Sequence, residues 1–319
     1  MSDPAITLLM RDHDYLAPLY GGDVIPEGIR LTIDRVTPMA RAYADASILA
    51  AELSFSRFLI GLSKGDRTWV GIPFFPIRAF RHRCFFVRRD SGLNDVKQLH
   101  GKRIGTNGWQ DTGNTWTRAV LREHGVRIDQ IHWLVGPVDN QNPTNPQGDF
   151  PPHVRPAPAG RPLRDMLLSG DLDAVMCPVP PKGFYAADGN MGRLIPDYRR
   201  AEQEYYRRTG IFPPHHIVGV RRDVFERSPQ IAPALYRALD QARLLWQQRR
   251  FYYAELTPWV LAELEETVSF MGEDWKPSGV RANRNCIQGL CAEEYAQGLI
   301  ERPIDPAAVF AEFDSVLKT

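Results

Sequence analysis

Short apolar runs alternate with longer stretches of helical periodicity through the first two thirds of the chain. Residues 6–10 (ITLLM) and 28–33 (GIRLTI) have the length and apolar content of strands, and residues 55–62 (FSRFLIGL) follow as a helix. Later strands are expected at 131–135 and 174–177. This alternation of strand and helix predicts an α/β protein whose sheets are mainly parallel.

The last third of the chain is expected to be helical, because its apolar positions recur at helical spacing. Four stretches follow this pattern: 232–248, 258–271, 293–300 and 306–317. Trp246, Trp259 and Trp275 accompany them and are expected to lie in the core, or to form a surface through which copies of the chain associate as a homo-oligomer. The sequence leaves both alternatives open.

A chain of 319 residues is too long for one ordinary hydrophobic core, so two lobes are expected. The apolar strand at 217–220 follows the whole second series of strands and helices, which indicates that the chain returns there to its first lobe. We therefore expect a discontinuous first lobe (1–88 and 216–319) and a second lobe (89–215). Two crossings make a hinge with a cleft between the lobes, where small ligands commonly bind.

The net charge of +1 gives no reason to expect nucleic acid or an anionic membrane as a partner. No stretch approaches the roughly 18 unbroken apolar residues of a membrane span, and the amino terminus lacks the basic and apolar regions of an export signal. The four cysteines are scattered without a CxxC pair, which favours reduced thiols over a disulfide framework or a thiolate metal site. These features predict a cytoplasmic protein.

Several segments resemble known families. The segments "DSGLNDVKQLHGKRIGT" and "LRDMLLSGDLDAV" look like type II periplasmic solute-binding proteins, which implies a two-lobed α/β fold with mixed parallel sheets. A sharper similarity, to the 4,5-dihydroxyphthalate decarboxylase family, an enzyme branch of that fold, lies in four segments: "AELSFSRFLIGL", "IPFFPIRAFRHRCFFV", "LIPDYRRAEQEYYRRTGIFPPHHIVGVRRDVFERSP" and "WVLAELEETVSFMGEDWKPSGVRANR". These segments come from all thirds of the chain, so the resemblance covers nearly its full length.

The resemblance implies decarboxylation of a hydroxylated aromatic carboxylate, most closely 4,5-dihydroxyphthalate, to protocatechuate and carbon dioxide. A phenol para to the departing carboxylate would push electrons into the ring, and a positioned acid would protonate the ring carbon. No organic cofactor is expected, because the hydroxyl supplies the electrons. The alternatives are a non-catalytic solute-binding protein for an aromatic acid, or another enzyme of the same fold.

The basic loop "FPIRAFRHR", residues 75–83, is the strongest cluster of candidate chemistry. The guanidinium group suits recognition of carboxylates, and a histidine can transfer a proton near neutral pH. With the family resemblance, Arg78, Arg81 and His82 are expected to line the cleft, the arginines as carboxylate ligands and the histidine in proton transfer. The alternative is a solvated basic loop.

A polar, glycine-containing turn joins the strand that ends at Thr106 to a helix that begins near Asp111 or Thr112. Exposed amides at a helix start bind carboxylates, and a tryptophan, Trp109 or Trp116, could cover an aromatic ring. Ordinary helix capping is the alternative. The side chains expected to contact the substrate here are Thr106, Asn107, Trp109, Gln110, Thr112 and Asn114.

Candidates for proton transfer stand at the ends of strands. Glu52 ends a buried apolar run, so desolvation is expected to raise its affinity for a proton and suit it as an acid. His215 and His216 are neighbours where the chain returns, and at most one of them is expected to face the ligand, because adjacent strand residues point opposite ways. His13, after the first strand, is a further candidate, and each of these residues has a purely structural alternative.

Two other features lie at the ends of strands. Asp12, His13 and Asp14 resemble a metal-binding triplet, but no partner motif accompanies them, so no metal is expected, and a divalent metal is the alternative. Cys177 ends a strand that is expected to face the cleft, where it either contacts the substrate or packs as an inert thiol.

Overall fold

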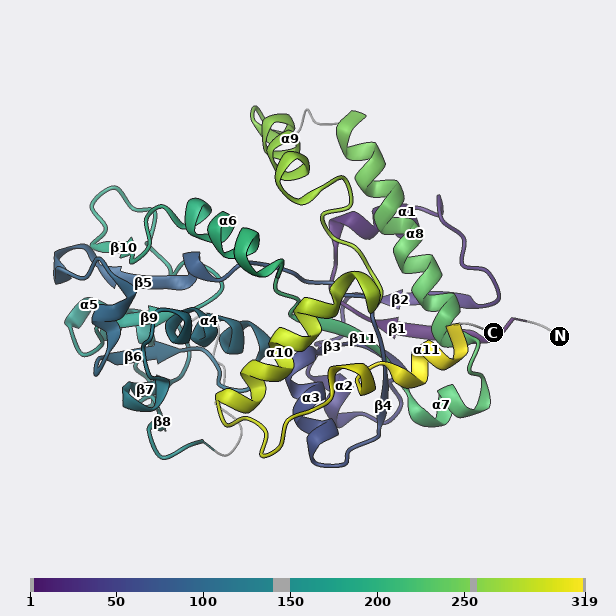
Figure 1. Ribbon diagram of the computed structural model, residues 1–319, viewed down its shortest axis with the longest axis horizontal. Coiled ribbons are helices and arrows are strands. Elements are labelled where there is room, and N and C mark those ends of the chain that lie inside the picture. The colour runs from purple at the N-terminus through teal and green to yellow at the C-terminus, as the bar shows by residue number, and fades with distance from the viewer. Residues whose placement is uncertain (1–2, 140–149, 253–256, 318–319) are drawn as a thin grey trace. The chain divides into compact units, whose positions relative to one another are not determined.

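The computed structural model describes residues 3–139, 150–252 and 257–317, and the chain divides into two compact units (Figure 1). Unit 1 consists of Met1–Arg78, Pro214–Cys291 and Arg302–Thr319, and unit 2 of Ala79–Pro213 and Ala292–Glu301. The first crossing was expected after Arg88, but residues 79–88 pack within unit 2. The basic loop is therefore divided, with Arg78 in unit 1 and both Arg81 and His82 in unit 2.

Unit 1 is built on a five-stranded mixed sheet. In spatial order its strands are β2 (Arg30–Asp34), β1 (Ala5–Leu9), β3 (Ala50–Ser54), β11 (His216–Arg221) and β4 (Trp69–Ile72). β1 is parallel to β2 and β3, whereas the returning strand β11 is antiparallel to β3 and β4. In this register Val218 lies opposite Glu52 and His216 opposite Ser54, so His216 reaches the carboxyl end of β3.

Helix α8 (Ile231–Tyr252) packs on this sheet and completes the core of unit 1 (Figure 1). Its Leu235 and Leu239 are fully buried in one cluster with Leu8 and Val218, and burial of each such side chain stabilises the fold by about 1.5–3 kcal/mol. The other helices that begin in unit 1 are α1 (Ala17–Tyr20), α2 (Arg41–Ala44), α3 (Phe55–Ser63), α7 (Arg222–Arg227), α9 (Val260–Met271), α10 (Arg284–Ala296) and α11 (Ala311–Leu317). Of these, α10 continues across the boundary into unit 2.

Unit 2 contains a six-stranded mixed sheet. In spatial order its strands are β10 (Met191–Arg193), β5 (Phe85–Arg88), β9 (Ala174–Met176), β6 (Arg103–Thr106), β7 (His132–Val135) and β8 (Val154–Pro156). Helix α4 (Thr112–Glu123) and helix α5 (Leu163–Ser169) pack on opposite faces, because Met176 joins the core under α4 and Val175 the core under α5. A third helix, α6 (Tyr198–Thr209), precedes the return to unit 1.

The predicted alternation of strands and helices is confirmed, and the strands expected at 131–135 and 174–177 correspond to β7 and β9. Both sheets are mixed: β1 pairs in parallel with β2 and β3, and β6 with β7 and β9, whereas β11, β5 and β10 run antiparallel to their neighbours. One helix begins earlier than expected: α10 starts at Arg284 rather than near 293. Trp259 is 74% exposed, so of its two expected environments the core is excluded.

No helix in the described ranges combines the length and the apolar composition that crossing a bilayer requires.

Candidate active site

The Glu52 side chain lies at the centre of a buried hydrogen-bonded cluster in unit 1, and it is 1% exposed. Its Oε2 atom accepts hydrogen bonds from the backbone N–H of Arg11 at 3.0 Å and from Nε2 of His13 at 2.9 Å. Its Oε1 atom accepts one from Nδ1 of His216 at 2.5 Å. An ionised carboxylate can only accept hydrogen bonds, so both of these histidine nitrogens carry a proton.

Three separate segments of unit 1 supply this cluster. Glu52 is the third residue of β3, next to β1, where Leu9 pairs with Ala51. The chain continues from the end of β1 past the carboxylate, which places the Arg11 amide and the His13 ring beside it. His216, the first residue of β11, approaches from the other neighbouring strand.

The two histidines decide the protonation state of Glu52. Burial by itself would raise the pKa of this carboxyl, but the hydrogen bonds and charge attraction of His13 and His216 outweigh it and hold the pKa well below its ordinary value. The expectation that desolvation makes Glu52 a proton donor was therefore wrong. An ionised Glu52 can instead orient the two imidazole rings and stabilise positive charge on them.

Each histidine keeps one ring nitrogen that does not face Glu52: Nδ1 of His13 and Nε2 of His216. The His216 side chain is 18% exposed and that of His13 is 10% exposed. His215 is 3% exposed, and its backbone N–H donates to the Ile77 carbonyl. Of the adjacent pair, His216 is therefore the residue that joins the Glu52 cluster.

A tyrosine and a lysine that sequence reasoning missed extend the cluster. The ring of Tyr15 lies 5.4 Å from the ring of His13, and its hydroxyl donates to the Pro76 carbonyl at 2.8 Å. The amine of Lys276 donates to the same carbonyl at 2.9 Å and lies 3.4 Å from the centre of the Tyr15 ring. Lys276 stands in a loop without a recognisable motif, and only its place in "GEDWKPSG", a segment of the family resemblance, could have marked it.

Arg78 is engaged in the same unit. Its Nη2 atom donates to the Pro277 carbonyl at 2.8 Å and to the side-chain oxygen of Asn283, and the guanidinium lies over the ring of Phe75. Arg78 therefore ties the segment that follows Lys276 to the loop after β4. The substrate contact expected of Arg78 stays a prediction.

In unit 2, Arg81 of the basic loop lies against the polar turn, although the sequence placed the two in different lobes. Arg81 is 8% exposed, and a Cβ atom on Gly113 would lie only 2.3 Å from its Nη2 atom. The guanidinium therefore lies directly against the first turn of α4, where Thr112 and Asn114 are also buried. Backbone amides and a guanidinium at one helix start form a site that suits a carboxylate.

Other residues of the polar turn differ in their surroundings. The hydroxyl of Thr106 donates to the Gly108 carbonyl at 3.2 Å. Gln110 is partly buried, and the side-chain oxygen of Asn107 is buried without a hydrogen-bond partner among the described residues. This oxygen is an acceptor within the turn that a ligand hydroxyl could satisfy.

Trp109 does not fit the expected role of covering a substrate ring. It is 3% exposed and lies in the core of unit 2, with Arg118 stacked 4.0 Å from its ring centre and the ring of Trp133 against its side. Cys177 is also buried in the core of unit 2. Its thiol donates to the Val179 carbonyl, and burial raises the pKa of this thiol. Trp109 was expected to contact the substrate, whereas Cys177 follows the second of its two alternatives, an inert thiol that packs in the core.

His82 does not fit the role of an acid at neutral pH. It is 3% exposed and packs edge-on against the ring of Tyr205. Burial, with smaller contributions from His124 and Arg208, lowers its pKa to about 4. The imidazole is therefore neutral near pH 7, contrary to the expectation that it would donate a proton there.

Glu202 on α6 is a buried acid that the sequence analysis did not single out, because α6 was not predicted as a helix. It is 8% exposed, and its Oε1 atom has no hydrogen-bond partner among the described residues. Burial raises its pKa to about 7, although Arg83, Arg193 and Arg81 pull in the opposite direction. The carboxyl is poised between its two protonation states near neutral pH.

The triplet of residues 12–14 does not act together. Asp12 pairs with Arg35, and His13 turns to Glu52. In ranges 3–139, 150–252 and 257–317, no three His, Cys, Asp or Glu side chains are grouped so that they could hold a metal ion.

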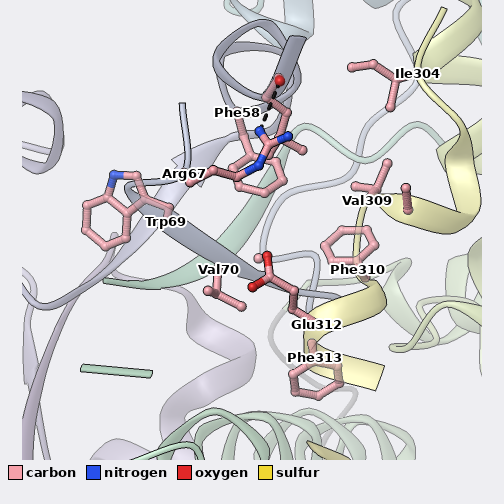
Figure 2. Close-up of a pocket in the computed structure, with 12 residues that line it drawn as sticks. Phe58, Arg67, Trp69, Val70, Ile304, Val309, Phe310, Glu312 and Phe313 are labelled. Carbon is pink, nitrogen blue, oxygen red and sulfur yellow. Dashed lines mark hydrogen bonds between the residues drawn. The ribbon is translucent and has the colours of Figure 1, made fainter. Parts of the chain in front are cut away.

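A pocket of about 210 Å³ lies elsewhere in unit 1, beside α3, β4 and α11 (Figure 2). Aromatic side chains such as Phe58 and Phe310 line it, and its charged residues are already engaged, Arg67 with the Leu62 carbonyl and Glu312 with Arg222. The volume is below the roughly 300 Å³ at which ligand sites usually begin. The residues that line this pocket include no histidine, unlike the Glu52 cluster.

The chain is similar to known proteins in both sequence and fold. A family model described as NMT1/THI5 like matches residues 79–148. The periplasmic aliphatic sulphonate-binding protein of Escherichia coli is 13% identical, with a TM-score of 0.56, and the match covers 98% of this chain and 92% of that chain. At that identity the likeness shows the fold, that of the two-lobed periplasmic solute-binding proteins.

Two relatives bear the name 4,5-dihydroxyphthalate decarboxylase. The protein of Comamonas testosteroni is 30% identical over 325 residues, which covers 97% of both chains. The protein of Pseudomonas putida is 30% identical over 209 residues, which covers 63% of this chain and 81% of the relative. The chain belongs to the 4,5-dihydroxyphthalate decarboxylase family.

Proposed function

We propose that this protein decarboxylates 4,5-dihydroxyphthalate, or a closely related dihydroxylated aromatic acid, to protocatechuate and carbon dioxide. Membership of the family supports the reaction class. The observation that carries the proposal for this chain is that His13 and His216 both donate to the buried carboxylate of Glu52. An ionised carboxylate that holds an imidazole is a common device for delivering a proton.

The ring proton comes from His216 in this mechanism. Its Nδ1–H donates to Glu52, so the opposite nitrogen, Nε2, is left to carry the transferable proton. Its side chain is also the more exposed of the two histidines in the cluster. The carboxylate of Glu52 stabilises the imidazolium before the transfer and keeps the ring in place afterwards.

Carbon–carbon cleavage follows the protonation. The hydroxyl para to the departing carboxylate feeds electrons into the ring as the ring carbon takes the proton from His216. The bond to the carboxylate then breaks, carbon dioxide leaves, and its electron pair restores the aromatic ring. The substrate supplies the electron push, so the step needs no organic cofactor.

Arg81 and the first turn of α4 are proposed to bind a carboxylate of the substrate. The guanidinium and the backbone amides of this turn are both suited to an anion, and both lie where water has little access. Asn107, Gln110, Thr112 and Asn114 belong to the same turn and are proposed to contact the substrate.

The proposal is tested by incubating the purified protein with 4,5-dihydroxyphthalate and measuring carbon dioxide together with the absorbance of the aromatic product. We expect carbon dioxide and protocatechuate in equal amounts, and no reaction with phthalate, which lacks the hydroxyls. The variant His216→Asn should lose turnover, whereas His215→Asn should retain more of it. Tight binding of dihydroxylated aromatic acids without any release of carbon dioxide would contradict the proposal and favour a solute-binding protein.

A further inference from the structure

Lys276 occupies a defined position beside the Glu52 cluster. It lies in the loop between α9 and α10, and its side chain is partly buried. Its amine donates to the Pro76 carbonyl at 2.9 Å and lies 3.4 Å from the centre of the Tyr15 ring. The Tyr15 hydroxyl donates to the same carbonyl at 2.8 Å. The lysine is therefore held at a fixed place and does not extend into solvent.

The contacts of Tyr15 connect this lysine to the proton-transfer group. The Tyr15 ring lies 5.4 Å from the His13 ring, and His13 donates to Glu52. Lys276, Tyr15, His13 and Glu52 thus form one continuous run of contacts within unit 1. The charge of Glu52 also acts on the amine of Lys276, so the two groups interact within unit 1.

The surroundings of Lys276 make its amine a proton acceptor. Burial lowers the pKa of the amine well below its ordinary value, and the charges of Arg78 and Arg243 add to this effect. Asp14 and Glu52 favour the charged amine but do not outweigh the burial. A lysine that loses its proton readily can serve as a general base.

Several other groups of the cluster are less suited to accept a proton. Glu52 already accepts three hydrogen bonds, and an arginine such as Arg78 has no acceptor atom. Burial raises the pKa of Tyr15 well above its ordinary value, so its hydroxyl keeps its proton. The lone pair of a neutral Lys276 is an acceptor that this arrangement offers, as is Nδ1 of His13, and an amine is the stronger base of the two.

We propose that Lys276 is a further catalytic residue, whose amine takes the proton of the substrate's phenol while His216 protonates the ring carbon. The inference rests on the proposed function and adds a general base to its mechanism.

The atoms and electrons balance in two steps. In the first, the phenol O–H bond breaks, its proton moves to Nζ of Lys276, and the ring carbon gains the proton of His216 to form a dienone. In the second, the bond to the carboxylate breaks, carbon dioxide departs, and the electron pair restores the ring as a phenolate. The phenolate takes the proton back from Lys276, and His216 regains its own from water.

Two variants test the role of the amine, with turnover of 4,5-dihydroxyphthalate as the first measurement. Lys276→Met removes the base and should lower kcat by about 100-fold or more. Lys276→Arg keeps a cation of similar length but cannot accept a proton, and it should be as slow. The exposed Lys64, on the C-terminal side of α3, supplies the control: Lys64→Met should leave kcat unchanged.

A second measurement does not depend on turnover. Protocatechuate retains the hydroxyls, and its ultraviolet difference spectrum on binding shows whether a phenol has become a phenolate. Wild-type protein should give the phenolate band near neutral pH, whereas Lys276→Met and Lys276→Arg should bind protocatechuate without it. Circular dichroism measures whether each variant is folded. If Lys276→Met does not fold, Lys276→Arg provides the test.

The outcomes separate this inference from the proposed function. If wild-type protein releases no carbon dioxide, the proposed function fails and the assignment of a base fails with it. If wild-type protein is active and Lys276→Met keeps kcat within about twofold, the function stands and the role of Lys276 is overturned. Restored activity in Lys276→Arg would likewise overturn it, since a cation alone would then suffice.

Discussion

The carboxylate of Glu52 accepts a hydrogen bond from Nδ1 of His216, a residue 164 positions later in the chain. The contact exists because β11 returns to the first sheet and runs antiparallel beside β3, with Val218 opposite Glu52. Side chains two residues apart on a strand share a face, so His216 lies on the face that Glu52 occupies. The hydrogen bond between Glu52 and His216 is thus a consequence of the returning strand.

The first prediction concerns the charge of Glu52. Glu52→Gln should lower kcat by about 100- to 10,000-fold, because the amide no longer stabilises an imidazolium on His216. Steady-state kinetics of carbon dioxide release measure this loss. The exposed carboxyl of Glu27 provides the matched control in unit 1, and Glu27→Gln should have unchanged kcat.

The same variant should change the stability of the protein in acid. The folded pKa of Glu52 is depressed, so its ionised form contributes stability above the ordinary value of 4.5, and this contribution is lost as the pH falls below it. The melting temperature of wild-type protein should therefore fall more steeply below pH 4.5 than that of Glu52→Gln. Parallel melting curves for the two proteins would show that Glu52 is not held as a carboxylate by its histidines.

Glu202 should have the opposite dependence on pH. In the unfolded chain this carboxyl ionises near pH 4.5, but in the folded chain it retains its proton up to about pH 7. Stability should therefore fall as the pH rises through this window, with the full penalty above it. Glu202→Gln removes the penalty and should raise the free energy of unfolding at pH 8 by on the order of 1–3 kcal/mol, with little change at pH 4.5.

Chemical denaturation at the two pH values measures this difference. The control is Glu204→Gln, an exposed carboxyl on the same helix that pairs only with Arg200 in the described residues. A loss of stability in Glu202→Gln at pH 8 would mean that the ionised carboxyl is stabilised by Arg83, Arg193 and Arg81.

Gly113 should prove necessary for the position of Arg81. A methyl group there would lie 2.3 Å from the Nη2 atom, so Gly113→Ala should push the guanidinium away from the first turn of α4. Loss of one charge-assisted hydrogen bond corresponds to about a tenfold to hundredfold weaker binding of phthalate, measured by calorimetry. The fold should tolerate the change, because alanine favours a helix over glycine by about 1 kcal/mol.

Gly61 in α3 offers the comparison for that experiment. A Cβ atom on Gly61 would meet Asp66 at ordinary contact distance, so Gly61→Ala gains the same helix preference without approaching Arg81. Unchanged phthalate affinity in Gly113→Ala would remove Arg81 and this turn from the proposed carboxylate site.

His82 should matter for stability in acid more than for catalysis. Its folded pKa of about 4 lies below the ordinary value of 6.5, so the unfolded state takes up a proton first as the pH falls through this range, and the fold loses stability. His82→Gln should therefore resist unfolding at pH 4.5 better than wild-type protein does. At pH 7 its kcat should be within a few-fold of wild type, and a loss as large as that of His216→Asn would restore His82 as a proton donor.

The sequence by itself was enough to recognise the alternation of strands and helices and the return of the chain at 217–220. It also singled out the basic loop and the polar turn, but it placed them in different lobes, whereas Arg81 lies against that turn within unit 2. These features depend on local periodicity and turn chemistry, which neighbouring residues along the chain determine.

Only the tertiary structure decided the protonation states and the partners of the candidate residues. Desolvation alone suggested that Glu52 would hold a proton, but His13 and His216 reverse this, and they come from segments far from β3 in the chain. Trp109 looked available in the sequence but is enclosed by Arg118 and Trp133. Burial and charge at a side chain depend on segments that only folding brings together, so no local pattern encodes them.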